Sequence, residues 1–274
     1  MNTPKAFKCI GYINELNKRN FKLYFKPLKS PKFEDIIENS IHWVGHATTI
    51  INIFGKIIIT DPVLTKRLGH LKRLVEPSID LSSFHADYIL LSHGHMDHLN
   101  YYTLKRLNKD CTIIVPKKFK RGISSLGFSK VVELGSDDNY TDDNLNINVF
   151  RANHDGKRLP FQKYCESNSY LITRKSKKVF FAGDTAFTDI YTGIQADAAI
   201  MPVGCYKPDE FQEMHCTPEQ SFKMFKMMKV RTMIPVHYKT FVLAQDNDKD
   251  TTDRLNKIND GSIKIIDVGQ TVSI

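Results

Sequence analysis

Three of the ten histidines fall within six residues, and this cluster carries the strongest chemical signal in the sequence. His93, His95 and His98 stand in the segment His-Gly-His-Met-Asp-His, together with Asp97. Imidazole nitrogens and carboxylate oxygens are ligands for zinc, iron or manganese, and no cysteine lies nearby to build a closed thiolate site. Because ring geometry would crowd four ligands around one ion, the spacing predicts two cations, with His93 and His95 on one and Asp97 and His98 on the other.

Three further ligand candidates follow apolar runs that read as strands. His154 comes after the run that ends at Phe150, Asp184 comes after residues 179–182, and His237 comes after residues 231–236. In layered α/β proteins the loops at the carboxyl ends of strands gather into a site. A lone histidine is more often a core or surface residue, so the shared position after strands carries this prediction.

The elements that must position these residues are short β-rich runs separated by polar turns. A hairpin is predicted over 50–54 and 57–60. Further strands are predicted over 88–92, 112–115, 130–134, 144–150, 170–173, 178–182, 198–201, 231–238 and 262–267. Helices are predicted over 100–107 and 218–229, the second because Thr217, Pro218 and Gln220 form a helix start. Two groups of strands with helices between and after them favour two sheets covered by helices, in a single domain.

The ligand pattern resembles that of the metallo-β-lactamase superfamily. Residues 93–98 match its signature motif, and His154, Asp184 and His237 follow in the order of its remaining ligands. The resemblance implies an α/β fold, a four-layer αββα sandwich over residues 41–274. It also implies two divalent cations, most simply zinc, with manganese or iron as alternatives. His93, His95 and His154 would bind one cation, Asp97, His98 and His237 the other, and Asp184 would bridge them.

Within the superfamily, the chain is most similar to the branch of phospholipases D that hydrolyse N-acylphosphatidylethanolamine. The matching pieces are Trp-Val-Gly-His-Ala-Thr at 43–48, Thr-Asp-Pro at 60–62, Phe-Ala-Gly-Asp-Thr at 181–185, Met-Pro-Val-Gly-Cys-Tyr at 201–206, and His215 followed by Pro218-Glu219. This resemblance favours catalytic roles for Asp97, Asp184 and His215. His215 stands just before a helix start and would contact phosphate or protonate a leaving group.

Five other residues are candidates for supporting the metal ligands or for contacting substrate. A ligand histidine generally donates its second ring N–H to a partner, and His46 and Asp61 could be such partners. Asp61, which precedes Pro62, could equally form a simple turn. Thr185, which follows Asp184, is a further candidate, and Tyr206 and Lys239 could offer a hydrogen bond or a charge to a substrate anion.

Two cations about 3.5 to 4 Å apart can share a water and lower its pKa toward about 7. A metal-bridging hydroxide would then attack a phosphodiester, and we expect a metal-dependent phosphodiesterase of phospholipase D type. The same centre could serve a lactonase or another acyl-ester hydrolase, which is the main alternative. A nuclease is less favoured, and a binding protein on a retired scaffold remains open, although the complete ligand set argues against it.

The net charge of +9 favours a small anionic or phospholipid substrate, and +6 of it lies in residues 1–30, where seven basic residues face Glu15 alone. We expect residues 1–40 to form a basic, aromatic leader that packs on the domain or extends from it. Residues 1–30 could meet an anionic membrane surface, although packing is the simpler interpretation. Nucleic acid is not favoured, because no long basic arm or added domain is present.

The five cysteines form no paired motif, and no run approaches the roughly 18 apolar residues that a membrane span needs. A cytoplasmic protein is therefore expected. It would lie at the membrane periphery if the leader binds lipid. Oligomeric state cannot be derived from these patterns.

Overall fold

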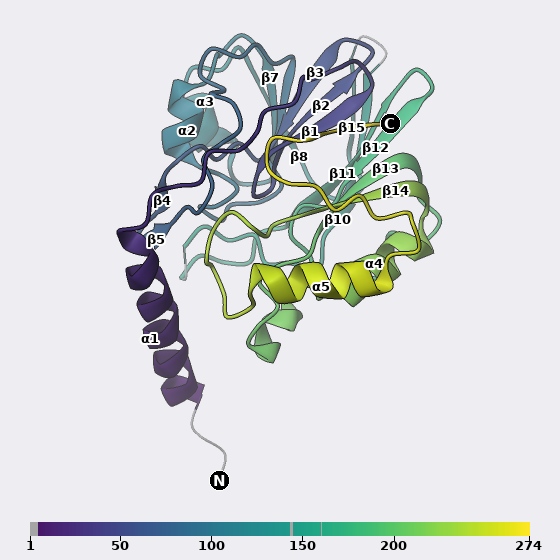
Figure 1. The fold of residues 1–274 in the computed structure, drawn as a ribbon. Helices are drawn as coiled ribbons and strands as arrows, with labels where there is room; N and C mark the ends of the chain where they lie inside the picture. The colour runs from purple at the N-terminus through teal and green to yellow at the C-terminus, as the bar shows by residue number, and fades with distance from the viewer. Residues whose placement is uncertain (1–4, 143–144, 160) are drawn as a thin grey trace.

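Two β-sheets packed face to face form the centre of the molecule (Figure 1). The computed structural model describes residues 5–142, 145–159 and 161–274. In the first sheet the strand order is β15-β1-β2-β3-β6-β7-β8, and in the second it is β14-β13-β12-β11-β10-β9. The first sheet consists of β1 (Ser40–Gly45), β2 (Thr48–Ile53), β3 (Lys56–Thr60), β6 (Tyr88–Leu90), β7 (Thr112–Pro116), β8 (Lys130–Leu134) and β15 (Thr271–Ser273). The second consists of β9 (Asn139–Asp142), β10 (Leu145–Arg151), β11 (Asn168–Arg174), β12 (Lys177–Phe181), β13 (Gln195–Pro202) and β14 (Lys229–Val236).

Helices cover the outer face of each sheet. The helices are α1 (Lys5–Tyr24), α2 (Tyr101–Arg106), α3 (Lys120–Ser124), α4 (Pro218–Met227) and α5 (Asp248–Ile258), with a short 3-10 helix η1 (Asp209–Glu213) and a small hairpin of β4 (Arg67–Leu68) and β5 (Leu71–Lys72). Figure 1 shows α2 and α3 beside the first sheet and α4 and α5 beside the second. This arrangement confirms the predicted four-layer αββα sandwich.

The alternation of side chains along each strand explains the two cores. In β2, Ile51 and Ile53 face the second sheet, whereas Ile50 faces the layer of α2 and α3. In β3, Ile58 faces the second sheet and Ile59 faces the layer of α2 and α3. Successive side chains of a strand point to opposite faces, so a strand covered on both sides must be apolar at every position. The isoleucine-rich runs of the sequence therefore belong to a sheet that is buried on both faces.

Most of the predicted elements are confirmed, and one strand is wrong. The hairpin of β2 and β3 is present, and the start of α4 has the predicted capping box between Thr217 and Gln220. The strand predicted over 262–267 is absent, because only Ile263 pairs there, in a single bridge with Met233. Beyond Ile263 the chain leaves the second sheet and crosses to the first, where it supplies β15 beside β1. The first residue of the strand predicted over 144–150 lies outside the described residues.

The amino-terminal leader forms the long helix α1, which projects to the lower left in Figure 1 and lies against β5. Residues 1–4 of the leader lie outside the described residues. Among the described residues, we find no helix that combines the length and the apolar character required to cross a bilayer.

Candidate metal centre

The four segments that carry the predicted ligands end at one edge of the sandwich. The loop of His93–His98 follows β6, and His154 follows β10. Asp184 follows β12, and His237 follows β14 directly. The structure thus brings together residues that are up to 144 positions apart in the chain. As expected, they meet where the loops after the strands gather.

Two glycines allow these loops to approach one another. A Cβ atom on Gly94 would lie 2.2 Å from the Phe119 ring and 2.6 Å from the Gly156 carbonyl oxygen. A Cβ atom on Gly204 would lie 2.1 Å from the carbonyl oxygen of His237. All three distances are shorter than real contacts of a Cβ atom, so glycine is required at both positions. His46, Asp61 and His237 themselves have positive φ angles, a strained conformation that is found most often at functional sites.

The first group of ligand candidates consists of His93, His95 and His154. The Nε2 atom of His93 lies 3.0 Å from Nδ1 of His95, and Nε2 of His154 lies 3.1 Å from the same atom. Three ring nitrogens therefore converge within one small volume. Imidazoles that meet in this way present their lone pairs to a common point, as three ligands of one cation do.

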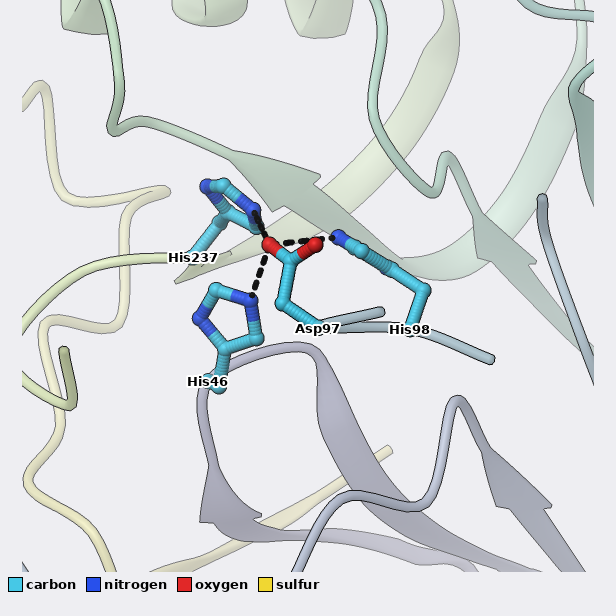
Figure 2. Close-up of side chains that lie close together, drawn as sticks. All are labelled: His46, Asp97, His98 and His237. Carbon is cyan, nitrogen blue, oxygen red and sulfur yellow. Dashed lines mark hydrogen bonds and ion pairs between the residues drawn. The ribbon is translucent and has the colours of Figure 1, made fainter. Parts of the chain in front are cut away.

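The second group consists of Asp97, His98 and His237, with Asp184 beside them. The Oδ2 atom of Asp97 lies 3.5 Å from Nε2 of His98 and 3.5 Å from Nε2 of His237 (Figure 2). The Oδ2 atom of Asp184 lies 3.2 Å and 3.1 Å from the same two nitrogens. Two carboxylates and two imidazoles thus surround a second point.

Other residues hold the ring nitrogens that face away from these two points. His154 donates from Nδ1 to the carbonyl oxygen of Met214 at 2.7 Å, and His98 Nδ1 lies 2.7 Å from Oδ2 of Asp61. His93 Nδ1 lies 2.9 Å from Oγ of Ser92, which in turn contacts Asp61 at 2.5 Å. Such partners fix the tautomer and the orientation of a ligand ring.

His46 supports the second group from the turn between β1 and β2. Its Nε2 atom lies 3.1 Å from Oδ2 of Asp97, and Figure 2 shows its ring directed at that carboxylate. The turn is fixed because Trp43 donates its indole N–H to the His46 carbonyl oxygen and Thr240 accepts the His46 N–H. His46 and Asp61 both lie where the sequence predicts partners of the ligands.

Burial and charge give the donors their protonation states. Burial lowers the pKa of His154 to about 4 and that of His46 to about 3, so both rings are neutral at pH 7. Burial would raise the pKa of Asp184, but His237 and His98 hold it well below its usual value. Burial would lower the pKa of His98 and of His237, but Asp184 raises both well above the usual value of histidine. Metal ions bind neutral imidazoles and ionised carboxylates, so a cation bound at the second group would displace the protons of these two rings.

The donor set fits two divalent cations. Nε2 of His98, Nε2 of His237 and Oδ1 of Asp184 are buried, and none has a hydrogen-bond partner among the described residues. Buried polar atoms without a partner are costly in a folded protein, which makes such atoms candidates for holding an ion. Nitrogen and oxygen donors without thiolate suit zinc and also accept manganese or iron.

A pocket of about 210 Å³ opens above the two points, and His215 stands in its wall. Nδ1 of His215 lies 3.7 Å from Oδ2 of Asp184. Burial lowers the pKa of His215 to about 3, so the ring is neutral at pH 7. Of the two roles expected from the sequence, this state favours donation of an N–H to a substrate oxygen over proton transfer to a leaving group.

Three predicted residues do not reach the centre. Tyr206 directs its hydroxyl to Asp250 and Thr251 of α5. Lys239 binds Asp267 at 2.7 Å and lines a different cleft. Both side chains are therefore held by partners outside the pocket in this structure, and their contact with substrate stays a prediction.

Thr185 lies close to the centre but faces away from it. Its hydroxyl donates to the Ala186 carbonyl oxygen and accepts the N–H of Asn153, which joins the loop of Asp184 to the loop of His154. Its place is between two ligand loops rather than in contact with substrate.

Sequence patterns did not reveal Ser92 and the Met214 carbonyl, which hold two of the rings. Ser92 directly precedes the histidine cluster, and a small polar residue at the end of an apolar strand could have drawn attention. A backbone carbonyl leaves no such signal. Four cysteines, Cys111, Cys165, Cys205 and Cys216, are free and buried, in line with the absence of a paired motif.

Comparison with known proteins identifies the family. Residues 56–238 match the model of the beta-lactamase superfamily domain. N-acyl-phosphatidylethanolamine-hydrolyzing phospholipase D 1 of Caenorhabditis elegans is 27% identical over 262 residues, which cover 83% of this chain and 74% of the relative. The mitochondrial protein of that name in Saccharomyces cerevisiae is 30% identical over 74% of this chain, which spans about half of the relative's length (48%).

Metal-dependent hydrolases are found among both the sequence relatives and the solved structures. A metal-dependent hydrolase of Bacillus cereus is 25% identical over 85% of this chain and 99% of the relative. The crystal structure of an isothiocyanate hydrolase from Delia radicum gut bacteria superposes with a TM-score of 0.72 at 20% identity, over 86% of this chain and 98% of the other. The chain belongs to the beta-lactamase superfamily, among its metal-dependent hydrolases of metallo-β-lactamase fold and on the branch of the N-acyl-phosphatidylethanolamine-hydrolysing phospholipases D.

Proposed function

We propose that this chain is a phosphodiesterase of phospholipase D type that works with two divalent cations, most simply zinc. The observation that carries the proposal is the pair of converging donor groups, His93 with His95 and His154 on one side, and Asp97 with His98 and His237 on the other. Asp184 would be shared, since Oδ2 faces the second group and Oδ1 is buried without a partner. Two cations held there would lower the pKa of a water and polarise a phosphoryl oxygen.

The chain's own residues would orient the reaction. Asp61 and His46 keep His98 and Asp97 in place, so the donors need not reorganise when substrate binds. His215 would donate an N–H to a phosphoryl oxygen from the rim of the pocket. The negatively charged phosphodiester would lie at the metal centre. The cations there would also have to neutralise the carboxylates of Asp97 and Asp184.

The apolar rim of the pocket favours a substrate with a hydrocarbon part. Leu68, Leu71, Met96, Phe211 and Leu243 line the pocket together with the ligand residues. A phosphodiester at the floor and an acyl chain against this rim would place an N-acylated phospholipid, the substrate named for the relatives, in the site. A lactone would use the polar floor but only part of the rim.

We also propose that α1 contacts an anionic membrane surface. Phe21 of α1 and Phe25, which directly follows the last residue of the helix, are 70% and 79% exposed, and their rings lie 6.0 Å apart. Lys22 and Lys26, both exposed, stand next to them. Exposed aromatic residues among lysines suit insertion into the headgroup region of a bilayer with anionic lipids.

The purified protein, with and without a chelator, should be assayed on an aryl phosphodiester, a lactone, an N-acylated phospholipid and single-stranded RNA. We expect chelator-sensitive cleavage of the aryl phosphodiester and of the phospholipid. Cleavage of the lactone alone would contradict the proposal, and cleavage of RNA alone would favour a nuclease instead. The Asp97→Asn variant serves as the control for contaminating hydrolases, since it should lose whatever activity belongs to this chain.

A further inference from the structure

Helix α1 contacts three separate walls of the pocket above the metal centre. Its buried stripe consists of Tyr12, Leu16, Arg19, Asn20 and Leu23, which recur at the spacing of one helix face. This face lies against η1, the small hairpin of β4 and β5, and the segment 241–246. Each of these three contributes an apolar side chain to the pocket.

Side chains of α1 donate hydrogen bonds to four backbone carbonyl oxygens of the segment 241–246. Tyr12 donates its hydroxyl to the carbonyl oxygen of Leu243 at 2.9 Å, and Asn20 donates to that of Val242 at 3.1 Å. Arg19 donates to the carbonyl oxygens of Ala244 and Asp246. A carbonyl removed from water needs a donor, so the docking of α1 helps to fix the course of this segment.

The other two walls are held in the same way. The ring of Tyr12 packs edge-on against Phe211 of η1, with ring centroids 4.9 Å apart. Asn20 accepts the backbone N–H of Lys72 in β5 at 3.0 Å, next to Leu71, which faces the pocket. Lys72 in turn binds the carbonyl oxygens of Leu23 and Tyr24 at the end of α1.

We propose that α1 supports the apolar wall of the substrate pocket from behind, and that Tyr12 is a positioning residue that sets, through Phe211 and Leu243, the shape of this wall for a hydrocarbon chain. The inference rests on the proposed function, because it takes the pocket to be the substrate's. Tyr12 is singled out because it contacts two of the pocket residues, Phe211 through its ring and the carbonyl oxygen of Leu243 through its hydroxyl. The leader then supports the pocket wall and is not only a membrane contact.

A series of alkylphosphonates tests this without requiring turnover. Methyl-, butyl-, hexyl- and octylphosphonate are titrated calorimetrically into the zinc-loaded full chain. We expect the affinity to rise with each added methylene until the apolar wall of the pocket is covered. The rise should be up to about fourfold per methylene, the value for a methylene that becomes fully buried. In Tyr12→Ala this dependence on chain length should be largely lost, while the affinity for methylphosphonate and the zinc content stay unchanged.

Two further variants separate pocket shape from general destabilisation. Tyr12→Phe keeps the contact with Phe211 and should retain most of the chain-length dependence. Ile13→Ala, on the adjacent outward-facing position that is 46% exposed, should match the unmodified chain. Circular dichroism and zinc content confirm that each variant is folded and loaded.

The possible failures are distinguishable. If octylphosphonate binds no better than methylphosphonate to the unmodified chain, or if Tyr12→Ala keeps the full dependence, the inference is overturned while the proposed phosphoryl site stands. If methylphosphonate itself does not bind, the proposed function is contradicted, and the inference falls with it.

Discussion

The Oδ2 atom of Asp61 lies 2.7 Å from Nδ1 of His98, and both side chains are fully buried. Asp61 also accepts the N–H of Ser92 at 2.7 Å, so the carboxylate joins the end of β6 to the ligand loop. It leaves Nε2 of His98 free to face Asp97 and Asp184. The candidate metal centre is therefore supported by a residue that is not itself part of either group of donors.

Asp61→Asn should weaken binding of the second cation about 10- to 100-fold. An amide at this position can turn its NH₂ toward Nδ1 of His98, which favours the tautomer with the proton on Nε2, the atom that must bind metal. Competition with a chromophoric chelator measures the change. Asp35→Asn, at an exposed position, is the matched control. Equal affinities in the two variants would remove Asp61 from this role.

Asp184→Ala should lower the metal content from two cations per chain to about one. The shared carboxylate is lost, and the second point keeps only Asp97, His98 and His237, whereas the three histidines of the first group remain. Elemental analysis after dialysis gives the stoichiometry, with Asp189→Ala on the exposed neighbouring loop as control. Unchanged metal content would exclude a bridging role.

His215→Ala should reduce kcat/KM for phosphodiesters by about 10- to 100-fold, the range for a lost hydrogen bond to a charged group. Because burial lowers the pKa of His215 to about 3, the neutral ring donates a hydrogen bond rather than a proton at pH 7. The loss should therefore be similar for substrates with nitrophenol and with alkyl leaving groups. A much larger loss for the alkyl leaving group would instead support protonation by His215.

Phe21→Ser with Phe25→Ser should weaken binding to vesicles of anionic lipid by about tenfold or more, because two exposed rings no longer enter the bilayer surface. Activity on a water-soluble phosphodiester should not change. Sedimentation with vesicles measures the binding. Tyr102→Ser, which removes an exposed ring from α2, should bind like the unmodified chain. Equal sedimentation of all three proteins would leave the outer face of α1 without this function.

The stability of the metal-free protein should fall between about pH 6.5 and 4, in part because of His42. Burial lowers the pKa of His42 to about 4, against a smaller opposing effect of Glu34. The unfolded chain thus binds a proton at this position in this interval that the folded chain does not, so the contribution of His42 to stability rises with pH up to about 6.5 and is then constant. His42 should contribute up to about 3 kcal/mol to the free energy of unfolding above this pH interval.

Urea unfolding at several pH values, compared between the unmodified chain and His42→Gln, isolates this term from those of the other histidines. His42 lies between Thr271 and Ser78, at 2.8 Å from each hydroxyl, away from the metal centre. Parallel pH profiles for the two proteins would contradict the assignment.

Much of the sandwich could be predicted from the sequence because its signals are local. The apolar runs of β2 and β3 and the capping box of α4 lie within a few residues. The crossing of residues 264–269 could not be predicted, because an apolar run that leaves one sheet for another looks like a strand. Helix α5 was missed as well, since it buries only Thr251 and Leu255 and so shows little apolar periodicity.

The residues of the site also fall into those that local sequence signals predict and those that only tertiary packing reveals. The sequence by itself determined the donor types, the clustering of His93, His95, Asp97 and His98, and the order of the later ligands, because these are properties of neighbouring residues and of strand ends. Only the tertiary structure decided that Asp61 holds His98, that Tyr206 and Lys239 face elsewhere, and that Tyr12 packs behind the pocket wall against Phe211 and Leu243. Tyr12 and Leu243 are separated by 231 positions. Such contacts depend on how whole elements pack against one another, and side-chain periodicity within a single element carries no record of its neighbour.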